Sequence, residues 1–173
     1  MTVNPDPRRA ITIDLAQRSP LWRARLPDAA RRSSAAARAA LAAAGTSVEG
    51  PAELSIVLAD DALLRALNKE WRGVDKPTNV LAFPAPAPEA APGAPLLLGD
   101  VVLAFETVAR EAIEQDKALA DHLAHLVVHG VLHLLGFDHQ AAADARRMEA
   151  LEIAVLARLG VADPYRVREA SDG

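Results

Sequence analysis

All five histidines of this chain lie in one stretch, residues 121–139, which reads DHLAHLVVHGVLHLLGFDH. Apolar residues recur in it at helical spacing, so most of the stretch should form a buried or half-buried helix. On that helix His129 and His133 are four residues apart and therefore lie on one face, one turn from each other. Gly136 can adopt a left-handed conformation that ends the helix, and His139 follows three residues later. The motif HxxxHxxGxxH thus predicts a zinc ion held by three imidazoles, with the fourth tetrahedral position open for water or substrate.

The other two histidines fit this site less well. Along a helix, His125 and His133 lie roughly 12 Å apart, so they are not expected to bind the same ion. We interpret His122 and His125 as packing or surface residues, and the alternative is that one of them lines the cleft beside the metal site. Asp138, next to the third predicted ligand, has two open roles: a hydrogen-bond partner of a ligand histidine, or a cap of the following helix.

The residue types around the predicted metal ion indicate which bond it would help to cleave. Zinc lowers the pKa of a bound water to about 7 and polarises a phosphoryl oxygen, which suits phosphodiester hydrolysis. In zinc proteases with an HExxH helix, a glutamate directly follows the first histidine and acts as the general base. Here that position is Gly130. The motif therefore argues against peptide hydrolysis.

Composition places these residues in a single globular domain spanning 1–173. The chain has 173 residues, of which 51% are hydrophobic, enough to bury a core. No apolar run approaches 18 residues, and the first residues lack the apolar core of a signal peptide, so we expect a cytoplasmic protein with no membrane partner. There is no cysteine. Metal ligands must therefore come from His, Asp and Glu.

The net charge of −4 hides an asymmetry along the chain. Residues 1–48 carry eight arginines and three aspartates, a net charge of +5, whereas residues 49–173 carry −9. The first third is therefore the better place for a polyanion to bind. Arg31, Arg32 and Arg38 fall on one predicted helix. The alternative is that they form only a solvated helix face.

The pattern of the remaining segments predicts four strands interleaved with about five helices, which implies a small sheet covered by helices. The expected strands are Arg9–Leu15, Glu53–Ala59, Asn79–Phe83 and a segment within Leu96–Phe105. The expected helices run from Pro27 to Gly45, from Asp60 to about Gly73, over Glu106–Ala118, through the histidine stretch, and over Ala141–Leu159. Pro84–Pro95 is expected to be a proline-rich surface loop, and the chain from about residue 162 a frayed tail.

Three separate motifs resemble one known family. HGVLHLLGFDH (129–139), LNKEWRGVDKPTNVLAF (67–83) and GDVVLAF (99–105) are similar, in the same order, to the YbeY family of metal-dependent endoribonucleases, the ribosomal RNA maturation factors. The resemblance implies an α+β fold with a four-stranded sheet and a zinc ion bound by His129, His133 and His139. It also implies an arginine in the cleft, which corresponds to Arg72. An arginine at a helix end can hold a phosphate through two parallel hydrogen bonds, or simply be solvated there.

The implied activity is cleavage of single-stranded RNA, in maturation of the 16S ribosomal RNA 3′ end and in ribosome quality control. The small ribosomal subunit and its associated factors are the implied partners, and no DNA is expected. The chain departs from the family pattern at Asn79, where the family usually has Asp, and at Ala82, where it has Ser. It also has Phe137 where the family has Tyr. Two other functions stay open: a zinc hydrolase acting on peptides, and a non-catalytic ribosome-binding factor with a structural metal.

Overall fold

The fold is built on a four-stranded mixed sheet. The computed structural model describes residues 11–44, 51–86, 94–138 and 140–166. The strand order is β1-β2-β4-β3, in which β1, β2 and β4 run parallel and the edge strand β3 is antiparallel to β4. The strands are β1 (Ile11–Gln17), β2 (Ala52–Ala59), β3 (Val80–Pro84) and β4 (Leu96–Ala104). The predicted α+β fold is therefore confirmed.

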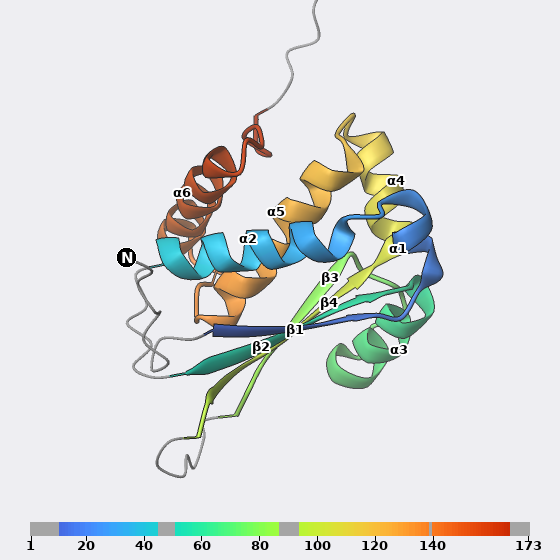
Figure 1. Cartoon of the computed structure of the whole chain (residues 1–173), viewed down its shortest axis with the longest axis horizontal. Helices are drawn as coiled ribbons and strands as arrows, with labels where there is room; N and C mark the ends of the chain where they lie inside the picture. Colours follow the sequence, from blue (N-terminus) through green and yellow to red (C-terminus); the bar gives the residue numbers. More distant parts are fainter. Residues whose placement is uncertain (1–10, 45–50, 87–93, 139, 167–173) are drawn as a thin grey trace, which may run out of the picture.

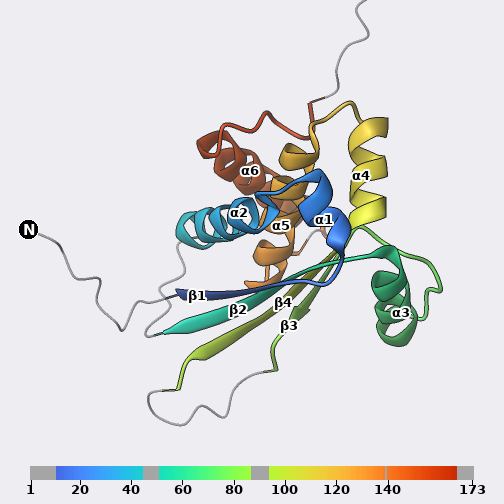
Figure 2. The same cartoon turned by 45° about the vertical axis from the view of Figure 1, so that its right-hand side comes forward.

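Six helices are present in the described residues, and they cover the sheet unequally. The helices are α1 (Pro20–Arg25), α2 (Ala29–Ala43), α3 (Asp61–Arg72), α4 (Phe105–Glu114), α5 (Leu119–Leu134) and α6 (Ala142–Arg158). Helices α2 and α5 lie over one face, with α6 stacked outside them, while α3 lies on the opposite side (Figures 1 and 2). Helix α5 is thus packed between the sheet and α6, as its apolar sequence predicts.

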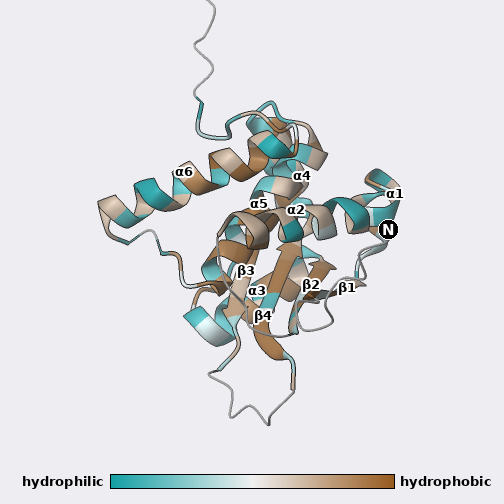
Figure 3. Cartoon of the chain, turned by 60° about the vertical axis from the view of Figure 1, so that its left-hand side comes forward, coloured by the Kyte–Doolittle hydropathy of each residue, from teal (hydrophilic) through white to brown (hydrophobic). Residues whose placement is uncertain are grey.

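The core follows from alternation in the strands. On β2, Leu54, Ile56 and Leu58 face α2 and α5 and are almost fully buried, while Val57 joins a smaller cluster under α3. Strand β4 has apolar residues on both faces and is coloured as hydrophobic along most of its length (Figure 3). A strand buried on both faces is expected in the middle of a sheet covered by helices.

Local signals explain most helix ends. Asp60 caps α3, accepting a hydrogen bond from the Leu63 amide at 2.9 Å, and Gly73 ends the helix with a φ of 71°. At the end of α5, the Phe137 amide donates to the Leu132 carbonyl and the Gly136 amide to that of His133, while Gly136 has a φ of 92°. This is the glycine-terminated turn that the sequence predicts.

Two predicted helix boundaries need correction, and one helix was not predicted. The helix expected from Pro27 begins at Ala29, and the separate helix α1 before it was not predicted. Its Trp22 is fully buried, with Nε1 donating to the Ala59 carbonyl at 2.9 Å, so this short helix closes one end of the core. Helix α4 ends at Glu114 rather than Ala118, because Asp116 adopts a φ of 53° and reverses the chain.

The predicted strand start at Arg9 and helix end at Gly45 lie outside the described residues, and the remaining predicted boundaries lie within about two residues of the observed ones. No helix of the described residues is long and apolar enough to cross a membrane. The middle of the proline-rich loop, 87–93, and the last residues, 167–173, lie outside the described part. The described part of the predicted frayed tail, 162–166, instead holds a hydrogen-bonded turn around Tyr165.

Candidate functional site

Two of the three predicted ligands meet on helix α5. His129 and His133 lie one turn apart, and their Nε2 atoms are 3.1 Å from each other. Two nitrogens bound to one tetrahedral zinc, each at 2.0–2.1 Å, would be about 3.3 Å apart. The two imidazoles are therefore arranged so that they could hold a single ion between them.

The third predicted ligand, His139, lies outside the described residues. Within those residues, no group of three or more His, Cys, Asp or Glu side chains is arranged to bind a metal. The turn at Gly136 does reverse the chain after His133, as a third ligand from this segment would require. The three-histidine set thus stays a prediction, with two of its members in suitable positions.

A residue that the sequence analysis missed, Glu152 on α6, contacts the first of these histidines. Its side chain is fully buried, and Oε1 accepts a short hydrogen bond from Nδ1 of His129. Burial would raise the pKa of Glu152, but its interactions with His125, His129 and Tyr165 outweigh this and lower the pKa to about 2. The carboxylate is therefore ionised, and Nδ1 of His129 is the donor.

The sequence did hold a signal for Glu152. On α6, Met148, Val155 and Leu156 are buried at helical spacing with it. A carboxylate in the middle of such an apolar stripe must be compensated by buried partners, so it marks a position worth testing for function.

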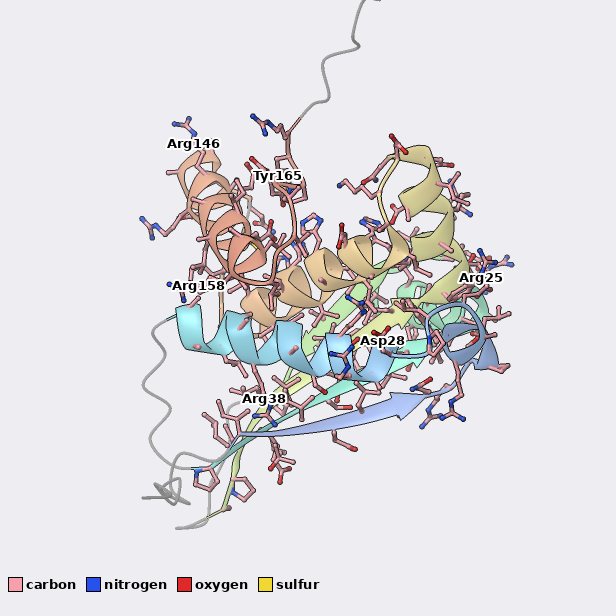
Figure 4. All side chains as sticks on the ribbon, turned by 45° about the horizontal axis from the view of Figure 1, so that its top comes forward. Arg25, Asp28, Arg38, Arg146, Arg158 and Tyr165 are labelled. Atoms are coloured by element: carbon pink, nitrogen blue, oxygen red, sulfur yellow. The ribbon has the colours of Figure 1, made fainter. Side chains whose placement is uncertain are left out.

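Tyr165 contributes from the turn that follows α6. Its hydroxyl donates to Oε2 of Glu152, and its ring contacts that of His125, with centroids 5.5 Å apart. Figure 4 shows Tyr165 beside α6, on the side toward α5. Burial and the adjacent Glu152 raise the pKa of Tyr165, so the hydroxyl keeps its proton and acts as the donor.

His125 belongs to this arrangement rather than to the packed core. Its Nε2 atom lies 3.3 Å from the Tyr165 hydroxyl and 3.5 Å from Oε2 of Glu152. His122, one turn earlier, is buried and bonds to Glu111 at 3.1 Å. Burial lowers the pKa of His122, and the hydrogen bond to Glu111 only partly offsets this.

A cleft of about 440 Å³ runs between α5 and the edge strand β3. Its lining residues are Arg72, Thr78, Asn79, Val80, Ala82, Pro84, His125, Leu126, His129, Gly130, His133 and Tyr165. The cleft thus brings together the two predicted ligands on α5 and Arg72 at the end of α3. Arg72 is exposed, and none of the ion pairs found among the described residues involves it.

Two of the three departures from the family pattern, Asn79 and Ala82, line this cleft, and Phe137 does not. Asn79 donates from Nδ2 to Oε1 of Glu111 at 3.0 Å, and its own Oδ1 accepts from the Val80 amide at 2.7 Å. Asn79 therefore fixes the start of β3. Ala82, two residues after Val80 on the same strand face, leaves that part of the wall apolar.

The arginines of α2 lie away from the cleft. Arg31 and Arg32 both pair with Asp28, at 2.8 and 2.9 Å. Arg38 donates to the Ile11 carbonyl and is seen below α2, near the start of β1 (Figure 4). These side chains remain exposed, on a helix that lies on the opposite side of the sheet from α3, which carries Arg72 (Figure 2).

Asp138 accepts a hydrogen bond from the Gln140 amide at 3.2 Å. Helix α6 starts later, after Ala141, and has no side-chain cap. Asp138 is therefore not the N-cap of that helix. Its alternative role, as a partner of a ligand histidine, stays a prediction.

Known proteins resemble this chain over most of its length. The model of the family described as Endoribonuclease YbeY matches residues 24–160. Proteins named Endoribonuclease YbeY from Paramagnetospirillum magneticum and Azorhizobium caulinodans are both 56% identical to it, over 90% and 88% of this chain and 97% and 95% of their own lengths.

One solved structure supports the fold. The solution structure of the protein TM1509 from Thermotoga maritima matches with a TM-score of 0.51 at 18% identity. The match covers 91% of this chain and 98% of the other. At this identity the likeness concerns the fold alone.

Proposed function

This chain belongs to the Endoribonuclease YbeY family, and on that premise we propose that it is a zinc-dependent endoribonuclease that hydrolyses single-stranded RNA. The observation that carries the proposal is the meeting of His129, His133 and Arg72 around one cleft. Imidazole ligands suit zinc better than magnesium or calcium, and a guanidinium suits a phosphate.

The predicted zinc ligands are His129 and His133 together with His139. When bound, zinc would supply a nucleophilic hydroxide near neutral pH and polarise a phosphoryl oxygen. The 3.1 Å separation of the two Nε2 atoms supports binding of one ion rather than two.

Arg72 is proposed to hold the phosphate that is cleaved. It lies at the C-terminal end of α3, lines the same cleft as the two histidines, and is exposed. Its planar guanidinium can donate two parallel hydrogen bonds to a phosphate and stabilise charge that develops there. It thus orients the scissile bond toward the two histidines.

The size of the cleft supports a single strand as substrate. Pockets of 300–1,000 Å³ hold ligands of drug size, so a cleft of about 440 Å³ can take about one nucleotide with its phosphate. Bases in single-stranded RNA can be splayed out one at a time, whereas those in a helix are stacked. A flexible strand can therefore enter a site that excludes a duplex.

The cellular role is proposed from the family resemblance. We propose that the substrate is ribosomal RNA, that the chain processes the 3′ end of 16S ribosomal RNA, and that it acts in ribosome quality control. Its partners would then be the small ribosomal subunit and associated factors, in the cytoplasm.

A peptide substrate is disfavoured by the structure around Gly130. A glutamate there would correspond to the base of the HExxH helix. A Cβ atom at this position would lie 2.7 Å from Cγ1 of Val101. A side chain at this position would require Val101 to shift, so the chain does not readily accommodate a glutamate base there.

The proposal is tested by measuring zinc and cleavage on the same preparations. We expect one equivalent of zinc by elemental analysis and cleavage of a labelled, unstructured RNA, with casein left intact. His133→Ala should lose both zinc and cleavage. His122→Gln, which changes a histidine of the same helix that lies outside the cleft and bonds to Glu111 instead, should keep its zinc. Stoichiometric zinc in a variant with all three predicted ligands changed to alanine would show that the site is wrong. Zinc without RNA cleavage would instead favour a ribosome-binding factor with a structural metal.

A further inference from the structure

Glu152 is a fully buried carboxylate on α6, a helix whose other charged side chains are exposed. Its relative exposure is 0%, the same as for Val155 and Leu156 beside it. Other charged residues of α6, such as Arg146 and Arg158, point to solvent (Figure 4). Burying an ionised group costs several kcal/mol unless partners compensate it, so such a residue has to be held by specific contacts.

The contacts of Glu152 join three parts of the chain. Oε1 accepts from Nδ1 of His129 on α5, 23 residues away, and Oε2 accepts from the hydroxyl of Tyr165, 13 residues away. Each carboxylate oxygen thus has its own hydrogen-bond donor, and Oε2 also lies 3.5 Å from Nε2 of His125. The carboxylate cannot rotate without breaking one of these bonds.

The turn that carries Tyr165 is itself fixed from two directions. The Tyr165 amide donates to Oδ1 of Asp163 at 2.8 Å. The ammonium group of Lys117, before α5, donates to the Pro164 carbonyl at 3.2 Å. The hydroxyl therefore has a defined position from which to hold the second oxygen of Glu152.

We infer that Glu152 and Tyr165 are positioning residues for the metal centre: the carboxylate keeps the proton of His129 on Nδ1, and Tyr165 keeps the carboxylate in place. With its proton on Nδ1, His129 directs the lone pair of Nε2 toward Nε2 of His133, 3.1 Å away. An ion would bind between these two nitrogens. The inference rests on the proposed zinc site. Neither residue touches the substrate in this role.

The consequence is a measurable effect on zinc affinity. Loss of a carboxylate that orients a ligand histidine typically weakens metal binding about 10- to 100-fold. Glu152→Gln should fall in that range, because a rotatable amide can present either its oxygen or its NH₂ group to Nδ1. Tyr165→Phe, which removes one hydroxyl from a residue that is 41% exposed, should fold normally and weaken binding by less.

The experiment combines zinc titration with NMR on the full chain. Zinc affinity is measured by competition with a chromophoric chelator for the wild type, Glu152→Gln, Tyr165→Phe and the control Glu149→Gln. The control makes the same change at an exposed position of α6. The tautomer of His129 is read from ¹⁵N chemical shifts of the metal-free proteins, a readout that needs neither zinc nor activity.

We expect metal-free wild type to hold His129 with its proton on Nδ1, and Glu152→Gln to show a mixed tautomer and weaker zinc binding, while Glu149→Gln matches the wild type. Unchanged zinc affinity and an unchanged tautomer in Glu152→Gln would overturn the inference. If the wild type bound no zinc, the proposed function would fail. The tautomer of metal-free His129 would still test the role of Glu152. A proton on Nε2 in the wild type would contradict the inference, and a move of the proton away from Nδ1 in Glu152→Gln would support it.

Discussion

Gly130 lies so close to Val101 that an added Cβ atom would be 2.7 Å from Cγ1 of that valine and 3.3 Å from Cγ2. This contact sets the distance between helix α5 and strand β4, because both residues are buried where the two elements cross. It also orients the helix. With Gly130 against the sheet, the neighbouring His129 and the following His133 reach the cleft beside β3.

We predict that Gly130→Ala destabilises the fold by about 1–3 kcal/mol, the usual cost of overpacking a core. Alanine is favoured over glycine inside a helix by about 1 kcal/mol, but the contact outweighs this. Val101 is β-branched and fully buried, so it cannot rotate away. Urea unfolding measures the change. In the double variant with Val101→Ala, the total loss should be smaller than the sum of the two single losses. A more stable Gly130→Ala protein would contradict this account.

The sequence predicted the fold wherever the signal was local. The cap at Asp60, the stop at Gly73 and the turn at Gly136 all depend on residues within one helical turn, and each was confirmed. Helix α1 was missed because its stability is not local. It has only six residues, and it is held by the burial of Trp22 under β2 and α4.

The residues of the candidate site were likewise predictable from the sequence only where the signal was local. Spacing alone placed His129 and His133 together, since both lie on one helix. Arg72 came only from a family resemblance, because nothing in its spacing shows that the end of α3 reaches the same cleft. Glu152 and Tyr165 lie 23 and 36 residues after His129, on segments whose packing depends on the whole fold. The apolar spacing on α6 marks Glu152 as a buried carboxylate, but it does not identify its partners.

For Arg72, we predict that alanine lowers the rate of RNA cleavage about 100- to 1,000-fold, the effect of removing one preorganised donor to transition-state charge. Zinc content and melting temperature should stay nearly unchanged, because Arg72 is exposed and forms no ion pair among the described residues. Arg72→Lys should recover only part of the rate, since lysine cannot form two parallel hydrogen bonds. Equal losses of stability and activity would show instead that Arg72 is structural.

For the arginines of α2, the sequence predicts a contribution to RNA affinity through charge. Replacing Arg31, Arg32 and Arg38 with glutamine should weaken binding to single-stranded RNA and flatten the plot of log affinity against log salt. Each phosphate contact contributes a slope of about 0.7 for a single strand, so the change can reach about 2. It should be smaller in practice, because Arg31 and Arg32 already share Asp28. An unchanged slope would place the RNA at the cleft beside Arg72 alone.

For Asn79, the structure predicts that the family's usual aspartate is harmful in this chain unless its partner changes too. Nδ2 of Asn79 donates to Oε1 of Glu111 at 3.0 Å. Asn79→Asp would replace that donor with an oxygen and place two carboxylates side by side, at a cost of about 1–3 kcal/mol. Two adjacent carboxylates raise the pKa of one of them in the folded state. The variant should therefore lose most stability as the pH rises above that pKa, and less at pH 4–5, where the pair can share a proton.

The control for this prediction is the exchange of both partners. In the double variant Asn79→Asp with Glu111→Gln, the NH₂ group of the glutamine can donate to the introduced carboxylate. The carbonyl of the glutamine can still accept from His122, which hydrogen-bonds to Glu111 in the wild type. This double variant should recover most of the stability lost at pH 7–8, as measured by urea unfolding at several pH values. If Asn79→Asp lost the same stability at pH 4.5 and pH 8, charge repulsion would not be the cause. The loss would then come from the start of β3, where Asn79 also accepts from the Val80 amide.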